Sequence, residues 1–99
     1  MLKSIKNKSI EDVFPKVMFW DVDMNKIFLD NDADFIIDRV LNWYMDDVKI
    51  LDLLDSIYPI DMIKYYAVNM DVRGNETIEF ICNRYNLKIS QFKYYLTYA

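Results

Sequence analysis

The sequence predicts an all-α fold, a compact single domain of four to five short helices. Its 99 residues are 54% hydrophobic, which is enough to build one buried core without disulfides. One glycine and two prolines leave few positions for the tight turns that β-hairpins need. Apolar residues also recur at intervals of three and four over much of the chain, and this spacing places them on one face of a helix.

The first sixteen residues differ from the rest in composition. Residues 1–12 are polar and lysine-rich, and apolar side chains such as Ile10 are too sparse there to bury a face. Pro15 lacks an amide donor and restricts the residue before it, so this segment does not fit inside a helix. We expect a flexible N-terminal arm over residues 1–16 and a helical domain over residues 17–99.

The most regular helical pattern covers residues 31–44. Asp30, Asn31 and Asp32 lie at its start and are suited to capping free backbone amides and to meeting the positive end of the helix dipole. The residues predicted to face the core are Ala33, Ile36, Ile37, Val40, Leu41 and Tyr44.

Two further helices follow after short connections. The second starts at Asp46 or Asp47 and ends before Pro59, which also suits the first turn of a third helix over residues 60–70. The predicted inward residues are Ile50, Leu51, Leu54, Ile57 and Tyr58 in the second helix, and Ile63, Tyr66, Ala67 and Met70 in the third.

A fourth helix is expected after Gly74. Asn75 would cap it by accepting from the amides near Ile78, and Asn86 can adopt the left-handed conformation that ends a helix. Ser90 would then cap a last short helix. The predicted inward residues are Ile78, Ile81, Cys82 and Tyr85 in the fourth helix, and Phe92, Tyr95 and Leu96 in the last.

The last two helices also resemble a helix-turn-helix in their spacing. Counted from Ile78, the small residue, the left-handed position and the three hydrophobes of that unit fall at suitable residues over 77–97. A plain helical corner makes the same demands, and the weak positive charge of this region favours the plain corner. If the unit binds DNA, the residues at the interface would be Arg84, Lys88, Gln91, Lys93 and Tyr94.

The stretch from Phe19 to Asp23 places two large aromatics directly before two aspartates. We expect Phe19 and Trp20 to fill the helical core, and Asp21 and Asp23 to accept from backbone amides where the chain turns toward its first long helix. A magnesium site is the alternative for the two aspartates. It is disfavoured because two carboxylates alone supply no nucleophile, no phosphate-binding glycine loop and no histidine base.

No catalytic, metal or cofactor site is predicted elsewhere. Histidine is absent and Cys82 is the only cysteine, so a four-ligand zinc site cannot form within the chain. The Asp30-x-Asp32-x-Asp34 pattern begins like a calcium loop but has Phe35 where that loop needs glycine. We therefore expect a protein that is not an enzyme and that needs no cofactor.

Charge is uneven along the chain, and its middle is acidic. Residues 17–60 carry ten aspartates against three basic residues, and such a surface repels phosphate, so nucleic acid is the less favoured partner. A protein partner with a basic surface is expected, and homodimerisation stays open. The predicted interaction residues are Asp34, Asp38, Asp46 and Asp47, with Tyr65 on an outer face. Apolar runs of at most four residues and the single cysteine predict a cytoplasmic protein that does not enter a membrane.

Three motifs resemble a family of small uncharacterised bacterial proteins. They are F-W-D-V-D at 19–23, F-I-I-D-R-V-L at 35–41 and T-I-E-F at 77–80, and the likeness extends over about residues 18–95. The chain departs from the family pattern at Pro59, at Ser90 and around residues 92–95. Members of this family lie beside nucleotidyltransferase-type toxin genes, so the resemblance implies an antitoxin-like or accessory partner of a toxin.

Overall fold

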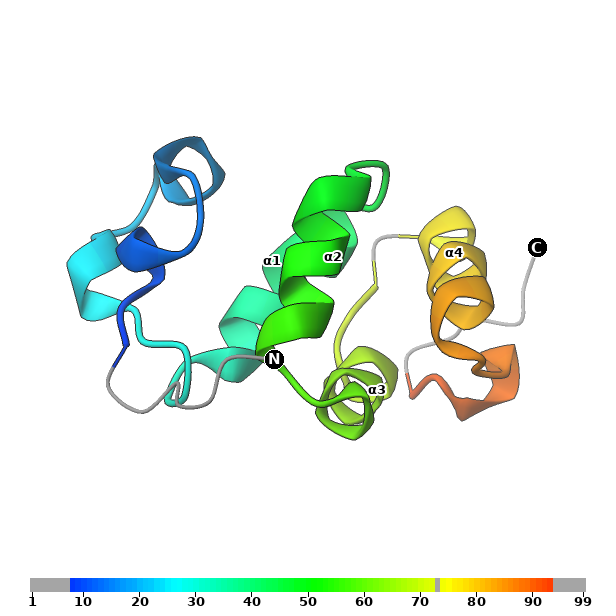
Figure 1. The fold of residues 1–99 in the computed structure, drawn as a ribbon. Helices are drawn as coiled ribbons and strands as arrows, with labels where there is room; N and C mark the ends of the chain where they lie inside the picture. The colour runs from blue at the N-terminus through cyan, green and yellow to red at the C-terminus, as the bar shows by residue number, and fades with distance from the viewer. Residues whose placement is uncertain (1–7, 73, 94–99) are drawn as a thin grey trace.

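The computed structural model describes residues 8–72 and 74–93, and it confirms the all-α prediction. These residues contain four α-helices, α1 (Ala33–Trp43), α2 (Val48–Ile57), α3 (Ile60–Asn69) and α4 (Asn75–Tyr85), together with four 3-10 turns, η1 (Ile10–Asp12), η2 (Lys16–Phe19), η3 (Met24–Lys26) and η4 (Ile89–Gln91). Figure 1 shows η1 to η3 at one end of the molecule, α1 to α3 in the middle, and α4 with η4 at the other end.

Helix α1 is the centre of the domain because it contacts α2, α3 and α4. Its predicted inward residues are buried, except that Tyr44 is half-buried at the end of the helix. Asp32 occupies the N-cap position without a side-chain bond to the helix; its Oδ2 instead accepts from the Phe28 amide at 2.9 Å. That bond closes the turn that leads into α1.

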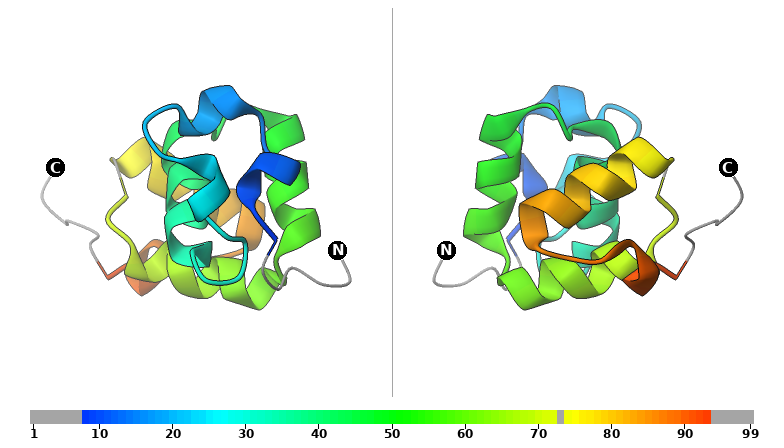
Figure 2. Two further views of the ribbon diagram at one scale, coloured as in Figure 1. Left: turned by 90° about the vertical axis from the view of Figure 1, so that its left-hand side faces the viewer. Right: turned by 90° about the vertical axis from the view of Figure 1, so that its right-hand side faces the viewer.

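Helices α2 and α3 follow the predicted pattern. Asp47 caps α2 by accepting from the Ile50 amide at 3.2 Å, and all five predicted inward residues of α2 are buried. Pro59 lies at the N-cap of α3, one position before the predicted first turn. In α3, Ile63 and Ala67 are buried, whereas Tyr66 and Met70 are only half-buried. Figure 2 shows α3 passing across the ends of α1 and α2.

Helix α4 buries its four predicted residues, but the prediction of its cap was wrong. Gly74 is the N-cap residue, and Asn75 is the first residue of the helix with no side-chain capping bond. Gly74 adopts φ 135°, a conformation that glycine tolerates because it has no Cβ. The other end agrees with the prediction, since Asn86 is left-handed (φ 56°, ψ 54°) and the Leu87 amide donates to the Cys82 carbonyl at 3.0 Å.

After α4, the described chain contains one 3-10 turn in place of the predicted last helix. Ser90 lies inside η4, not at its cap, and the Lys88 amide donates instead to Gln91 Oε1 at 2.7 Å. Phe92 is buried but has extended backbone (φ −79°, ψ 122°), so the turn ends there. The predicted positions Tyr95 and Leu96 lie outside the described residues.

The prediction of a flexible arm over residues 1–16 was wrong for its second half. Ile10 and Phe14 belong to the core, and the Ile10 amide donates to the Ile27 carbonyl at 2.9 Å. The Leu29 amide donates to the Lys8 carbonyl at 2.8 Å, beside an isolated bridge between Ser9 and Phe28. Residues 1–7 lie outside the described part of the chain.

The buried core therefore extends from η1 to Phe92. Tyr58 connects the N-terminal turns to the helices, because its hydroxyl donates to the Leu29 carbonyl at 2.8 Å and both residues are buried. Burial also raises the pKa of the Tyr58 hydroxyl well above its usual value, so this group stays protonated and keeps its donor. No helix in the described residues has the length and apolarity needed to cross a membrane.

Candidate functional site

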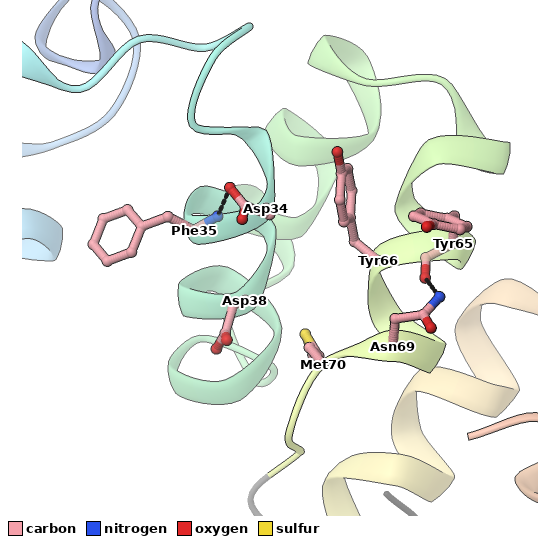
Figure 3. Close-up of a pocket in the computed structure, with 7 residues that line it drawn as sticks. All are labelled: Asp34, Phe35, Asp38, Tyr65, Tyr66, Asn69 and Met70. Atoms are coloured by element: carbon pink, nitrogen blue, oxygen red, sulfur yellow. Dashed lines mark hydrogen bonds between the residues drawn. The ribbon is translucent and has the colours of Figure 1, made fainter. Parts of the chain in front are cut away.

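A hollow on the described surface lies between α1 and α3. It has a volume of about 490 Å³ and is open to solvent. Figure 3 shows the side chains that line it; Tyr66 lies between α1 and α3, whereas the Phe35 ring extends away from α3. They are Asp34, Phe35, Asp38, Tyr65, Tyr66, Asn69 and Met70, and we call this hollow the α1–α3 groove.

One wall of the groove is acidic. Asp34 and Asp38 are four residues apart on α1, so they lie on the same face one turn apart. Asp38 Oδ1 accepts from Asn42 Nδ2 at 2.8 Å, and the same nitrogen donates to the Asp71 carbonyl at 3.3 Å. Within residues 8–72 and 74–93, neither carboxylate forms an ion pair. Asp34 Oδ1 accepts from the Phe35 amide at 2.8 Å, so a hydrogen bond orients each of the two acidic side chains of this wall.

The facing wall is aromatic. Tyr65 and Tyr66 pack edge to face, with ring centroids 5.4 Å apart and an interplanar angle of 73°. Tyr65 is 64% exposed although its ring is large, and Tyr66 is half-buried. Asn69 Nδ2 donates to the Tyr65 carbonyl at 2.7 Å, which places this amide at the edge of the groove.

This combination of side chains suits a cation. Carboxylates accept charge-assisted hydrogen bonds from guanidinium and ammonium groups, and the faces of tyrosine rings attract the same cations. Among the described residues, no three His, Cys, Asp or Glu side chains converge in a way that could hold a metal ion.

The structure brings together three of the five residues predicted to bind a protein partner. Asp34, Asp38 and Tyr65 all line the groove, although Tyr65 is distant from the aspartates in sequence. Asp46 and Asp47 lie instead beyond the other end of α1, where Asp47 caps α2. The single acidic face predicted from the sequence is thus divided between two places.

Sequence reasoning missed four of the groove residues, Phe35, Tyr66, Asn69 and Met70. The period of α3 placed Tyr66 and Met70 among the inward residues, and they do lie on the side of α3 toward α1. They line an open hollow because α1 and α3 do not close over them. The spacing of apolar residues shows which side of a helix faces the core, but not how far apart two helices lie. The sequence therefore held no direct signal for the groove.

A second cluster connects the F-W-D-V-D and F-I-I-D-R-V-L motifs. Arg39 donates to both carboxylate oxygens of Asp21, with an Nη2 to Oδ2 distance of 2.8 Å, and to the Met18 carbonyl at 3.1 Å. Its guanidinium lies over the rings of Phe19, at 5.4 Å, and Phe35, at 5.0 Å. The Arg39 side chain is only 14% exposed, so this cluster attaches the turn after η2 to the middle of α1.

The Arg39 cluster corrects part of the structural-anchor prediction. Phe19 is fully buried as expected, but Trp20 is 78% exposed and does not fill the core. Asp21 mainly engages Arg39, whose hydrogen bonds lower the pKa of the Asp21 carboxyl. Asp23 forms a long ion pair with Lys26 at 3.9 Å and makes no capping bond to η3.

The residues predicted for the DNA-binding alternative have other surroundings. Arg84 Nη2 donates to Asp52 at 3.1 Å and to Asp55 at 2.7 Å, so α2 carboxylates hold this cation. Lys88 and Gln91 are both exposed, and the Gln91 side chain accepts from the Lys88 amide at the start of η4. Lys93 is exposed and its amide donates to the Val68 carbonyl at 2.8 Å, whereas Tyr94 lies outside the described residues.

Comparison with known proteins adds one finding. Residues 14–48 match a family of unknown function, DUF6922. No curated protein and no solved structure matches the chain. The family match agrees with the resemblance to an uncharacterised domain family, and it says nothing of gene neighbourhood or partner.

The matched segment runs from Phe14 to Val48, and it contains one of the two walls of the groove. Both partners of the Asp21 and Arg39 pair lie within it, as do Asp34 and Asp38. The tyrosines of α3 lie beyond its end. The match therefore covers η2, η3 and α1, and α1 supplies the acidic side of the groove.

Proposed function

We propose that this chain is a non-enzymatic protein-interaction module that binds a basic segment of a partner protein in the α1–α3 groove. The observation that carries the proposal is the meeting of two carboxylates from α1 with two tyrosine rings from α3 across one open hollow. An arginine or lysine side chain entering the hollow would pair with Asp34 or Asp38 while its charge lies near the rings.

The exposure of Tyr65 supports the same proposal. Large aromatic side chains at protein interfaces supply much of the binding free energy, since they bury a large area at a low cost in conformational entropy. Tyr65 is held by its contact with Tyr66, so little ordering is needed when a partner binds. The two tyrosines thus provide a preformed apolar wall for the stem of a basic side chain.

The test is a titration of the ¹⁵N-labelled protein with the tetrapeptide Ac-Arg-Ala-Ala-Ala-NH₂, followed by amide chemical shifts. We expect saturable changes at residues 34–38 and 65–70, with a dissociation constant of roughly 1 mM, because one anchored side chain supplies only about 4 kcal/mol. The peptide Ac-Gln-Ala-Ala-Ala-NH₂, which lacks the charge, should bind much more weakly.

Matched variants separate a specific site from general attraction. Asp34→Asn combined with Asp38→Asn should abolish the changes, while Asp23→Asn combined with Asp46→Asn removes the same charge elsewhere and should leave them intact. Equal loss in both double variants would show that only net charge matters and would refute the proposal. Binding should also weaken as salt increases, since ions screen exposed charges beyond about 8 Å at 0.15 M ionic strength.

An antitoxin-like or accessory role is one case of this proposal, and it comes from the resemblance to proteins encoded beside toxin genes. A toxin partner would need to present a basic segment to the groove. Calorimetry at low salt with the product of the neighbouring gene tests that case. Binding that is unaffected by the Asp34→Asn and Asp38→Asn substitutions would place a toxin at another surface.

The helix-turn-helix alternative has less support. Of its predicted contact residues, Arg84 is held by two carboxylates, and η4 is a single 3-10 turn. A mobility-shift assay on the DNA upstream of the gene, with Lys93→Glu and Gln91→Ala variants, tests it. A shift that both variants abolish would favour DNA binding over the proposal made above.

A further inference from the structure

A second hollow lies on the other side of Tyr65 from the α1–α3 groove. It is bounded by α3 and by the chain from the end of α4 to η4, and it has a volume of about 290 Å³. Val68 and Leu87, both half-buried, supply its apolar surface, while Lys64 and Gln91 lie among its polar lining. Tyr65 lines both hollows, so its ring stands between them.

Helical geometry explains why Tyr65 separates the two hollows. With about 3.6 residues per turn, Lys64 and Val68 lie on one side of Tyr65, and Tyr66 and Asn69 lie on the other. The hollows therefore flank a single exposed aromatic ridge on α3.

The second hollow is held open by backbone bonds. The left-handed Asn86 turns the chain after α4, and the Leu87 amide donates to the Cys82 carbonyl. Farther on, the Lys93 amide donates to the Val68 carbonyl of α3 at 2.8 Å. These bonds attach both ends of the η4 segment and keep Leu87 beside Val68.

The two hollows differ in chemistry. The α1–α3 groove carries Asp34 and Asp38, and the described residues that line it include no basic side chain. The second hollow has an apolar floor, and its charged lining residues, Asp61 and Lys64, are of opposite sign. A ligand that fills both hollows should therefore present a cation on one side of Tyr65 and an uncharged apolar group on the other.

We propose that the partner of this module is an extended segment that straddles Tyr65, with a basic residue in the α1–α3 groove and a large aliphatic residue, three positions away, in the second hollow. The spacing follows from polyproline II geometry, in which residues three positions apart lie on the same side of the chain and three residues of about 3.1 Å each span roughly 9 Å. Charge complementarity fixes which anchor enters which hollow. This inference rests on the proposed function and specifies the partner that the groove recognises.

The experiment compares tetrapeptides that differ only in the second anchor. The probes are Ac-Arg-Ala-Ala-Leu-NH₂ and Ac-Leu-Ala-Ala-Arg-NH₂, which cover both chain directions, against Ac-Arg-Ala-Ala-Ala-NH₂ and Ac-Ala-Ala-Ala-Arg-NH₂. In one of the two chain directions, we expect the leucine peptide to bind about fivefold to tenfold more tightly than the matching alanine peptide. The reason is that part of the leucine side chain is removed from water in the second hollow. New chemical-shift changes should appear at residues 64, 68 and 87.

Substitutions in the protein locate each anchor. Leu87→Ala should remove most of the gain from leucine and leave binding of the alanine peptides unchanged. Tyr65→Ala should weaken all four peptides, whereas Trp20→Ala, which removes an exposed aromatic at the N-terminal turns, should weaken none. Far-UV circular dichroism establishes that each variant is folded.

The outcomes distinguish this inference from the proposal on which it rests. If the arginine anchors bind in the groove but leucine adds nothing in either direction, the two-hollow partner is wrong and the basic-segment proposal stands. If no peptide binds, both fail. Self-association that Tyr65→Ala abolishes, without peptide binding, would assign this surface to a second copy of the chain and overturn the inference.

Discussion

Phe19 and Trp20 are neighbours in sequence with opposite environments, and replacing each by alanine gives a sharp test of the fold. Phe19 is fully buried and contacts Phe14 edge to face with ring centroids 5.8 Å apart, and the ring of Phe35 lies 6.1 Å away. Removing a buried phenylalanine ring costs about 3–5 kcal/mol through lost burial and the cavity that remains. The guanidinium of Arg39 would also lose one of its ring contacts.

Trp20→Ala should change the free energy of unfolding by no more than about 0.5 kcal/mol, since its side chain is 78% exposed. The measurement is urea denaturation followed by circular dichroism at 222 nm, which does not depend on the tryptophan that is removed. A total stability of about 5–15 kcal/mol is typical of small domains, so Phe19→Ala leaves a weakly stable protein. Phe19→Leu, with a smaller expected loss of about 1–2 kcal/mol, covers the case in which the alanine variant does not fold.

Similar losses in the two alanine variants would refute this account. A large loss for Trp20→Ala would mean that its ring is buried in solution and that the turn after η2 has another conformation. A small loss for Phe19→Ala would mean that the N-terminal turns do not contribute to the core.

Three further predictions concern hydrogen bonding and ionisation. Tyr58→Phe should cost about 1–3 kcal/mol in thermal unfolding, because the buried Leu29 carbonyl loses the donor that lies 2.8 Å away. Asp21→Asn should lower stability near neutral pH and matter less in acid. The folded-state pKa of Asp21 is depressed below 3.8 by its hydrogen bonds with Arg39, so its contribution is present above that pH and is lost as the pH falls through the folded-state pKa. Cys82 should react far more slowly with a thiol reagent in the folded protein than in urea, because burial raises the pKa of the thiol and shields it.

Each of these three has a control and a contrary outcome. Tyr65→Phe removes an exposed hydroxyl and should be neutral, so an equal loss in Tyr58→Phe and Tyr65→Phe would argue against a special buried bond. Asp23→Asn replaces a carboxylate in a long, exposed ion pair and should cost little stability, so an equal loss in Asp21→Asn and Asp23→Asn would argue against a special role for the Arg39 pair. Rapid modification of Cys82 under native conditions would show that α4 opens readily.

The helices were predictable from the sequence because their signals are local. The inward residues of α1 and α2 repeat with the helical period, and Asp47 and Asn86 have local roles at helix ends. The Asn75 cap was wrong because two adjacent residues, Gly74 and Asn75, both suit that position. The choice between them depends on the path of the loop that connects α3 to α4.

The N-terminal turns and the groove were less predictable because both depend on contacts distant in sequence. Ile10 and Phe14 lie in short 3-10 turns and adjoining loops, which repeat no pattern long enough to identify a buried face. Trp20 follows a buried phenylalanine, and only the direction of the turn after η2 places it outside. Predicting the groove requires the relative position of α1 and α3. The sequence pattern of neither helix specifies that position.

The two backbone bonds that join residues 8–10 to residues 27–29 have a consequence for amide exchange. They close the chain around η1 to η3, and the Ile10 and Leu29 amides are their donors. If this end of the molecule opens as a cooperative unit while α1 to α4 stay folded, both amides should exchange with solvent at one common rate, faster than those of α1. Their protection would then report how often residues 8–10 separate from residues 27–29, and Phe19→Leu should raise that shared rate without changing exchange in α4.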